Sequence, residues 1–150
     1  MAVVNLHLIS KREQLSIFAP QDPGLDKRER VRIEQARVVY AETARLPGEG
    51  KNYYVTGDFN DHEHSNTLKT LVGESNANLV VTLPPDTRYD YNHRGKLQVL
   101  MHGIVPKRYV DEGKADYEII HGNELIGIEP GADTDKPSDH AYVLAKIGLG

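Results

Sequence analysis

The sequence contains no cysteine and no tryptophan, and only two phenylalanines and two methionines among its 150 residues. The absence of cysteine excludes disulfides, thiolate nucleophiles and cysteine-ligated zinc sites. No apolar run approaches the roughly 18 residues that a membrane-spanning helix needs. Residues 1–10 lack the basic start of a signal peptide. We therefore expect no membrane partner, and a cytoplasmic location by default.

The charge balance is slightly acidic, with 22 Asp and Glu against 18 Lys and Arg, a formal net charge of −4. Such a chain does not bind nucleic acid by bulk electrostatics, so a local basic strip or a bound metal would be needed for that. An apolar content of 39% in 150 residues is enough for one hydrophobic core. We expect a single domain spanning residues 1–150.

Hydrophobic periodicity predicts a chain of mixed strands and helices. Residues 27–46 have the spacing of an amphipathic helix that ends at “PGEG”, and residues 67–73 form a shorter one. The remaining apolar segments are typical of extended chain, namely residues 3–9, 52–57, 78–85, 87–95, 96–105, 115–122 and 141–149. This order predicts a layered α/β or α+β fold, with helices on one face of a mixed, mostly antiparallel sheet.

The segment “GDFND” ends the strand at 52–57 and brings together Asp58, Asn60 and Asp61. Alternate residues of an extended chain point the same way, so Asp58 and Asn60 are expected to converge. Carboxylate and amide oxygens suit a hard cation such as Mg²⁺ or Ca²⁺. The same residues are also typical of a simple turn, and spacing alone leaves both interpretations open.

Histidines next to strands supply two further candidates. His7 lies within an apolar strand, which is typical of a core histidine unless a carboxylate fixes its tautomer. Asp139 and His140 precede the last strand and are candidates for a functional site. The alternative interpretation is an N-terminal strand cap followed by a surface histidine. His62 and His64 flank Glu63 in a polar loop, for which we expect no zinc site because no third ligand is identifiable.

Five segments in order resemble the endonuclease/exonuclease/phosphatase (DNase I-like) superfamily: “VNLHLISK”, “RVRIEQARVVYAET”, “YYVTGDFND”, “YDYNHRGKLQVLMHGIV” and “SDHAYVLAKI”. The chain looks most like the bacterial nuclease branch, whose members are often secreted, which makes an extracellular location the alternative. The resemblance implies a four-layer α/β sandwich, of which this chain would be the C-terminal half. It also implies metal-assisted attack of water on a phosphoester, most readily of DNA or RNA.

The resemblance assigns catalytic roles to His7, Asp58, Asn60 and His140. Asp58 would orient or deprotonate water, and Asn60 would hold the phosphate. His140 would contact the phosphate or act as general base, and His7 would take part in acid–base chemistry.

The metal implied by the resemblance is Mg²⁺ or Mn²⁺, with Ca²⁺ as a further candidate. Asp58, Asn60 and Asp139 are its expected ligands. Lys11, Arg88 and Arg94 are candidates for phosphate contacts, although they match no strict motif position.

The chain departs from the family in two respects. The Asn and the metal-binding Glu of the family's first half have no counterpart, and Met101 stands where the family has an acid that orients the terminal histidine. A thioether is only a weak hydrogen-bond acceptor, and Asp90 is not expected to substitute for that acid. The motif residues that are present favour a metal-dependent nuclease or phosphatase, whereas these departures count against catalysis. The alternatives are a catalytically impaired remnant that dimerises or binds, and a phosphatase acting on small phosphoesters.

The absent half of the sandwich also predicts a partner. A sheet face that normally meets a second sheet would expose apolar side chains, which soluble monomers rarely do. Two copies packed sheet to sheet about a two-fold axis would cover it. We therefore expect a homodimer.

Overall fold

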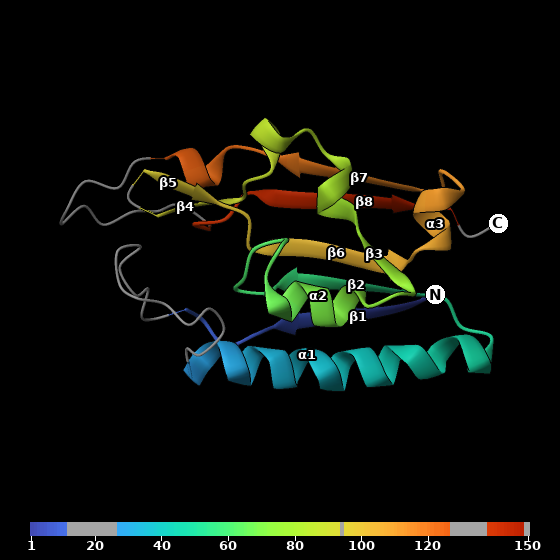
Figure 1. Ribbon diagram of the computed structural model, residues 1–150. Coiled ribbons are helices and arrows are strands. Elements are labelled where there is room, and N and C mark those ends of the chain that lie inside the picture. The colour runs from blue at the N-terminus through green and yellow to red at the C-terminus, as the bar shows by residue number, and fades with distance from the viewer. Residues whose placement is uncertain (12–26, 94, 127–137, 149–150) are drawn as a thin grey trace.

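The computed structural model describes residues 1–11, 27–93, 95–126 and 138–148 (Figure 1). Its helices and strands, in chain order, are β1 (Ala2–His7), α1 (Lys27–Arg45), β2 (Tyr53–Asp58), α2 (Asn66–Val72), β3 (Asn76–Asn78), β4 (Tyr91–His93), β5 (Lys96–Gln98), β6 (Met101–Pro106), α3 (Arg108–Asp111), β7 (Ala115–Ile120) and β8 (Tyr142–Ile147). The fold is α+β, as the periodicity predicts.

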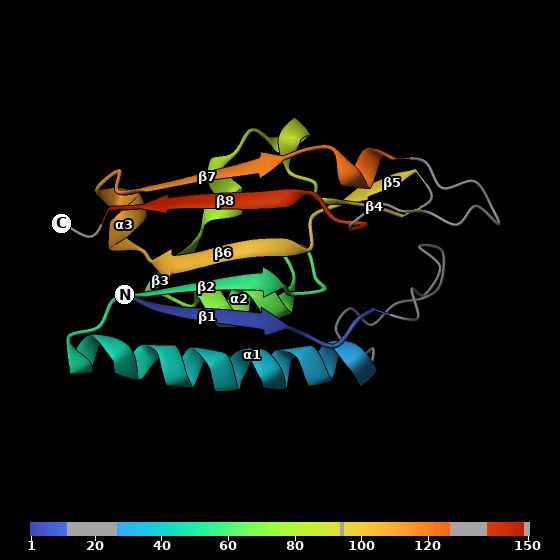
Figure 2. The ribbon, with the colours of Figure 1, turned by 180° about the vertical axis from the view of Figure 1, so that it is seen from behind.

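The main sheet has the strand order β1-β2-β6-β3. β1 and β2 run parallel, whereas β6 pairs antiparallel with both β2 and β3. The pairs β4–β5 and β7–β8 form two separate antiparallel hairpins. α1 runs along the β1 edge and α2 covers one face, while Figure 2 shows the strands uncovered from behind. Because β1 and β2 are parallel neighbours, their carboxyl ends meet at one edge, with His7 opposite Asp58.

The first core cluster lies between the main sheet and helices α1 and α2. In β1 every second side chain is exposed, and the alternate ones, Val4 and Leu6, pack inward as the alternation predicts. The buried members of this cluster are Leu8, Ala36, Tyr53, Val55, Phe59, Leu68, Leu71 and Ile104. Full burial of each large apolar side chain contributes about 1.5–3 kcal/mol, so this cluster holds the helices against the sheet.

The second core cluster joins β6 to the β7–β8 hairpin. Its buried members include Leu79, Val80, Val105, Tyr109 and Tyr117. The hairpin contributes only the inward-facing half of its side chains, so its other face is exposed.

Both predicted helices are confirmed, with boundaries set by local chemistry. α1 gives way to a 3₁₀ turn, Leu46–Glu49, which closes at Gly50 with φ of 70°, a backbone conformation that favours glycine. α2 begins after Ser65, whose hydroxyl accepts a hydrogen bond from the Leu68 amide at 3.2 Å. None of the helices in the described ranges is both long and apolar enough to cross a membrane.

Three segments differ from the expected strands. Among the described residues of the segment 87–95, only Tyr91–His93 form a strand, and Thr87 belongs to the 3₁₀ turn Pro85–Thr87. Residues 79–82, in a segment expected to be extended or buried, form a 3₁₀ turn in which Leu79 and Val80 are buried. The Asn78 side chain caps this turn by accepting a hydrogen bond from the Val80 amide. The predicted strand at 96–105 is split into β5 and β6. At the break the amides of Leu100 and Met101 donate to the Asp90 carboxylate, at 2.6 and 3.0 Å, instead of to a neighbouring strand.

Candidate active site

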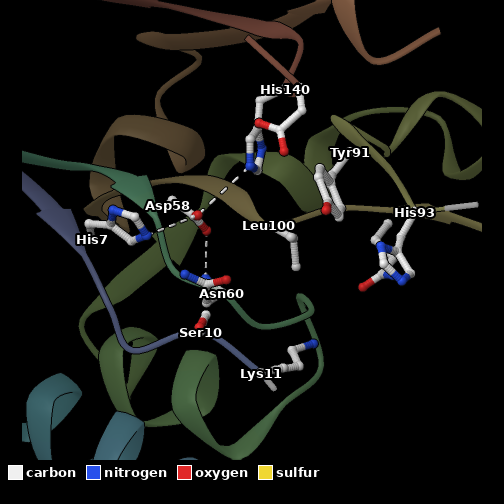
Figure 3. A pocket seen from close by; sticks show the side chains of 11 residues that line it. His7, Ser10, Lys11, Asp58, Asn60, Tyr91, His93, Leu100 and His140 are labelled. Carbon is white, nitrogen blue, oxygen red and sulfur yellow. Dashed lines mark hydrogen bonds and ion pairs between the residues drawn. The ribbon is translucent and has the colours of Figure 1, made fainter. Parts of the chain in front are cut away.

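A pocket of about 660 Å³ lies at the edge of the sheet where β1 and β2 end (Figure 3). His7 and Lys11 reach it from β1 and the residues that follow, and Asp58 and Asn60 reach it from the end of β2. The strand β4 and the segment before β8 form the opposite wall, which includes His140. The parallel pairing of β1 and β2 thus brings residues more than 50 positions apart to one cavity.

Asp58 lies at the centre of the polar groups in this pocket. Its Oδ1 accepts a hydrogen bond from the backbone amide of Asn60 at 2.8 Å. Its Oδ2 lies 3.4 Å from His7 Nε2 and 3.8 Å from His140 Nε2. Burial raises the pKa of Asp58 above its usual 3.8, although the Asn60 amide and the two histidines act against this shift. Asp58 is therefore a stronger proton acceptor than an exposed carboxylate.

Asn60 is held in place by its backbone and by its side chain. It is the only non-glycine residue with positive φ in the described ranges, at 51°, a conformation that asparagine tolerates better than most residues. Its side-chain nitrogen Nδ2 donates a hydrogen bond to the Leu8 carbonyl at 2.9 Å. This bond ties the end of β2 to the end of β1 and leaves the amide oxygen as the group that can act in the pocket.

His140 is oriented by Asp90, contrary to expectation. Asp90 Oδ2 lies 2.6 Å from His140 Nδ1, and Asp90 is fully buried. Its other oxygen accepts the two amides at the β5–β6 break, so the carboxylate has a fixed orientation. Asp90 was not expected to orient His140, and the structure corrects that expectation, because its carboxylate is the group next to Nδ1. A carboxylate next to Nδ1 favours the tautomer with a proton on Nδ1, which leaves Nε2 facing Asp58.

The pKa of His140 is raised above its usual 6.5. Burial opposes the charged ring, but the hydrogen bond to Asp90 and the negative charges of Asp90 and Asp58 outweigh that effect. At neutral pH the imidazolium form of His140 is thus stabilised inside the pocket, next to a carboxylate.

Asp61 does not line the pocket, and its contacts stabilise the loop after β2. Its side chain accepts hydrogen bonds from Arg32 Nε at 3.1 Å and from Thr67 Oγ1 at 2.7 Å. Burial opposes its charge, but these partners and the charge of Lys11 lower the pKa of Asp61 below its usual value. The loop after β2 is thereby fixed to α1 and α2, with Asp58 and Asn60 at its start.

Of the three residues predicted to contact phosphate, Lys11 lines the pocket. Its Nζ lies 3.3 Å from Asp61 Oδ1 and 3.2 Å from His62 Nε2. Burial lowers the pKa of Lys11, although Asp61 acts in the opposite direction. Asp61 therefore holds a cation at the wall of the pocket.

The other two predicted phosphate contacts are not found there. Arg88 does not line the pocket, because its guanidinium donates to the carbonyls of Leu83 and Val81, both at 2.7 Å. Its role in the structure is to close the turns before β4. Arg94 lies outside the described residues.

The fit of a metal depends on the oxygen donors of the pocket. Asp58 and Asp139 both line it, together with the Asn60 amide. No cluster of three or more His, Asp or Glu side chains suited to a metal occurs in the described part of the chain. One or two carboxylates with waters and substrate oxygens suffice for Mg²⁺, so these donors fit a water-rich site of that kind.

Sequence reasoning missed two aromatic side chains of the pocket, Tyr91 and His93. Their signal was the alternation in “YDYNH”, which places both residues on one side of β4. The interior position of Asp90 had no such local signal.

A search of known protein families finds no matching family model, and no curated protein matches the chain.

Proposed function

We propose that this chain is a metal-dependent phosphoester hydrolase, and that nucleic acid phosphodiesters are its substrates. One observation carries the proposal: His7 and His140 approach the same oxygen of Asp58, at 3.4 and 3.8 Å, in a pocket that also holds Asn60 and Lys11. In this arrangement Asp58 can accept a proton, His140 can supply a positive charge and His7 can donate a proton, all close to one phosphorus atom.

In the proposed reaction a water oxygen attacks phosphorus while the bond from phosphorus to the leaving oxygen breaks. Asp58, whose pKa is raised, accepts the proton from water. His140, held by Asp90, donates a hydrogen bond from Nε2 to a phosphoryl oxygen and offsets its charge. His7 is the candidate to protonate the leaving oxygen.

The remaining polar groups bind the phosphate. The Asn60 amide and the Lys11 ammonium both line the pocket and suit phosphoryl oxygens. Asp139 and Asn60, with water molecules, would hold a Mg²⁺ or Mn²⁺ ion next to the Asp58 carboxylate, and the ion would supply charge neutralisation and Lewis acidity when bound.

The test is nicking of supercoiled plasmid by purified protein with Mg²⁺, Mn²⁺, Ca²⁺ or EDTA. We expect metal-dependent nicking that falls by about 10²–10⁴-fold or more in an Asp58→Ala/His140→Ala double variant, because both proton-transfer groups are lost. The matched control is Asp86→Ala/His64→Ala, which removes an exposed acid and an exposed histidine outside the pocket. Nicking by nucleases from the expression host would persist in the Asp58→Ala/His140→Ala variant, which therefore also controls for contamination.

Equal nicking by wild type and the Asp58/His140 variant would contradict the proposal. It would favour a catalytically impaired remnant that serves as a dimerising or binding module. Hydrolysis of small phosphomonoesters without nicking would favour the phosphatase alternative.

The homodimer is likewise a proposal. In Figure 2, strands β1, β2, β6, β8 and β7 lie side by side with no described helix in front of them. Four exposed apolar side chains lie on these strands: Val3, Ile120, Tyr142 and Leu144. We expect a two-chain particle in analytical ultracentrifugation, and a shift to single chains in Leu144→Glu but not in Leu97→Glu, an exposed leucine on β5. A single chain at all concentrations would contradict this expectation.

A further inference from the structure

Three aromatic rings form a row along one wall of the pocket. The rings of His140 and Tyr91 are stacked, with centroids 4.8 Å apart and an interplanar angle of 26°. His93 continues the row, 6.2 Å from Tyr91 at 20°. Tyr91 and His93 are alternate residues of β4 and therefore project from the same side of the strand. Figure 3 shows Tyr91 between His140 and His93.

The row leads from the proposed reaction centre to solvent. His140 approaches Asp58 at one end of it, Tyr91 is partly buried, and His93 is exposed. Both Tyr91 and His93 line the pocket. An exposed, nearly parallel ring at the pocket wall, next to a phosphate-binding position, offers a flat π-surface to any group attached to that phosphate.

From this arrangement we infer that His93, stacked on Tyr91, presents a stacking surface for a nucleobase next to the scissile phosphate, so that the preferred substrate is an unpaired nucleotide chain, including the strand-separated segments of a supercoiled plasmid. This inference rests on the proposed hydrolase function and narrows its substrate class. Aromatic side chains bind single strands by stacking on bases, largely independently of sequence. A base in a duplex is already stacked and paired, and cannot lie flat on a protein ring without being extruded.

The size of the cavity agrees with this substrate. A volume of about 660 Å³ lies within the range of roughly 300–1,000 Å³ typical of pockets for organic ligands. A small phosphomonoester would leave the aromatic wall unused. Lys11 supplies a cation for the backbone phosphate from the β1 side of the same pocket.

The experiment compares two single-stranded substrates of equal length and charge, oligothymidylate and an oligomer of abasic deoxyribose phosphates. Binding is measured by fluorescence anisotropy in EDTA, and cleavage is measured separately with Mg²⁺ or Mn²⁺. The variants are His93→Leu, Tyr91→Leu and Tyr91→Phe. The matched control is His64→Leu, an exposed histidine that does not line the pocket.

We expect His93→Leu and Tyr91→Leu to weaken oligothymidylate binding by about 5- to 150-fold, the range for one lost base stack. Binding of the abasic strand should stay within two-fold of wild type in His93→Leu, and Tyr91→Phe should retain binding because its ring remains. His93→Leu is the decisive variant, because Tyr91 also packs on His140.

Equal losses on both strands would overturn the inference, because they would mean that the rings support the fold or the phosphate site. So would unchanged binding of both strands in His93→Leu, or tighter binding of duplex than of single strand by the wild type. Failure of the hydrolase proposal has a different signature, namely absence of cleavage with any metal. A base-dependent binding loss would then still establish the stacking surface.

Discussion

The carboxylate of Asp90 lies 2.6 Å from Nδ1 of His140, although the two residues are 50 positions apart in the sequence. Asp90 reaches this position because its backbone pairs with β5 on one side and with Ala141 on the other. Its side chain is fully buried and accepts two further backbone amides. The contact with Asp90 therefore fixes the orientation of the His140 ring.

Replacement of Asp90 by Asn tests this pair. We expect kcat for phosphodiester cleavage to fall by about 10²–10⁴-fold, because an amide does not stabilise the imidazolium and can favour the wrong tautomer. Asp86→Asn, at an exposed acid, should leave kcat unchanged. ¹⁵N NMR of the imidazole should report a proton on Nδ1 of His140 in wild type and its redistribution in Asp90→Asn. An unchanged His140 spectrum would contradict the orienting role.

Removal of the Arg32 charge should destabilise the fold. Arg32 and Asp61 form a buried ion pair at 3.1 Å. Without Arg32, Lys11 at 3.3 Å remains as a cation next to Asp61, so the loss should approach, but not exceed, the value of about 3–5 kcal/mol that is typical of breaking a buried pair. Arg32→Met should show this loss in urea unfolding. Arg37→Met, which removes an exposed pair with Glu34 on the same helix, should change the free energy of unfolding by less than about 1 kcal/mol. Similar losses of unfolding free energy in both variants would contradict the prediction that the buried ion pair stabilises the fold more than the exposed one.

Stability should decrease in mild acid because of His102. Burial lowers the pKa of this fully buried ring from 6.5 to about 4, against the opposing hydrogen bond to the Asp61 carbonyl. Between these pH values the unfolded chain binds a proton that the folded chain does not. The free energy of unfolding should therefore fall by on the order of 3 kcal/mol from pH 6.5 to 4, with no further contribution from His102 below that.

Urea unfolding across this pH range measures the effect. A His102→Asn variant should lose most of the slope, whereas His64→Asn should keep it because His64 is exposed. Titration of the His102 resonance near pH 6.5 in the folded protein would contradict the prediction.

Gly57 should tolerate no side chain. It pairs with Leu6 between β1 and β2 and has φ of 129°. A Cβ at this position would lie 2.0 Å from the Leu6 carbonyl oxygen, so Gly57→Ala should cost about 4 kcal/mol or abolish folding. Gly48→Ala meets no atom within 4 Å and should change stability by less than about 1 kcal/mol. Thermal unfolding of both variants measures the difference, and near-wild-type stability of Gly57→Ala would contradict it.

The elements with strong local signals were predictable from the sequence. The alternation in residues 3–9 identifies β1, and the stop at “PGEG” locates the end of α1. Asp58 and Asn60 are recognisable because they end an apolar strand, whereas His7 and His140 are assigned to the site only by the family resemblance. Such patterns extend over a few residues, and the geometry of one strand or helix turn suffices to interpret them.

Only the tertiary structure determines which side chains meet. Asp90 and Arg88 are both polar residues before β4, but the fold buries the first against His140 and uses the second to cap a turn. Asp61 resembles a third oxygen ligand in “GDFND”, yet it pairs with Arg32 from α1. The sequence by itself determines the strands, the helices and the chemistry available at their ends. The long-range pairings β1–β2 and Tyr91–His140 decide which of those groups form the pocket, because proximity across tens of residues depends on packing rather than on local periodicity.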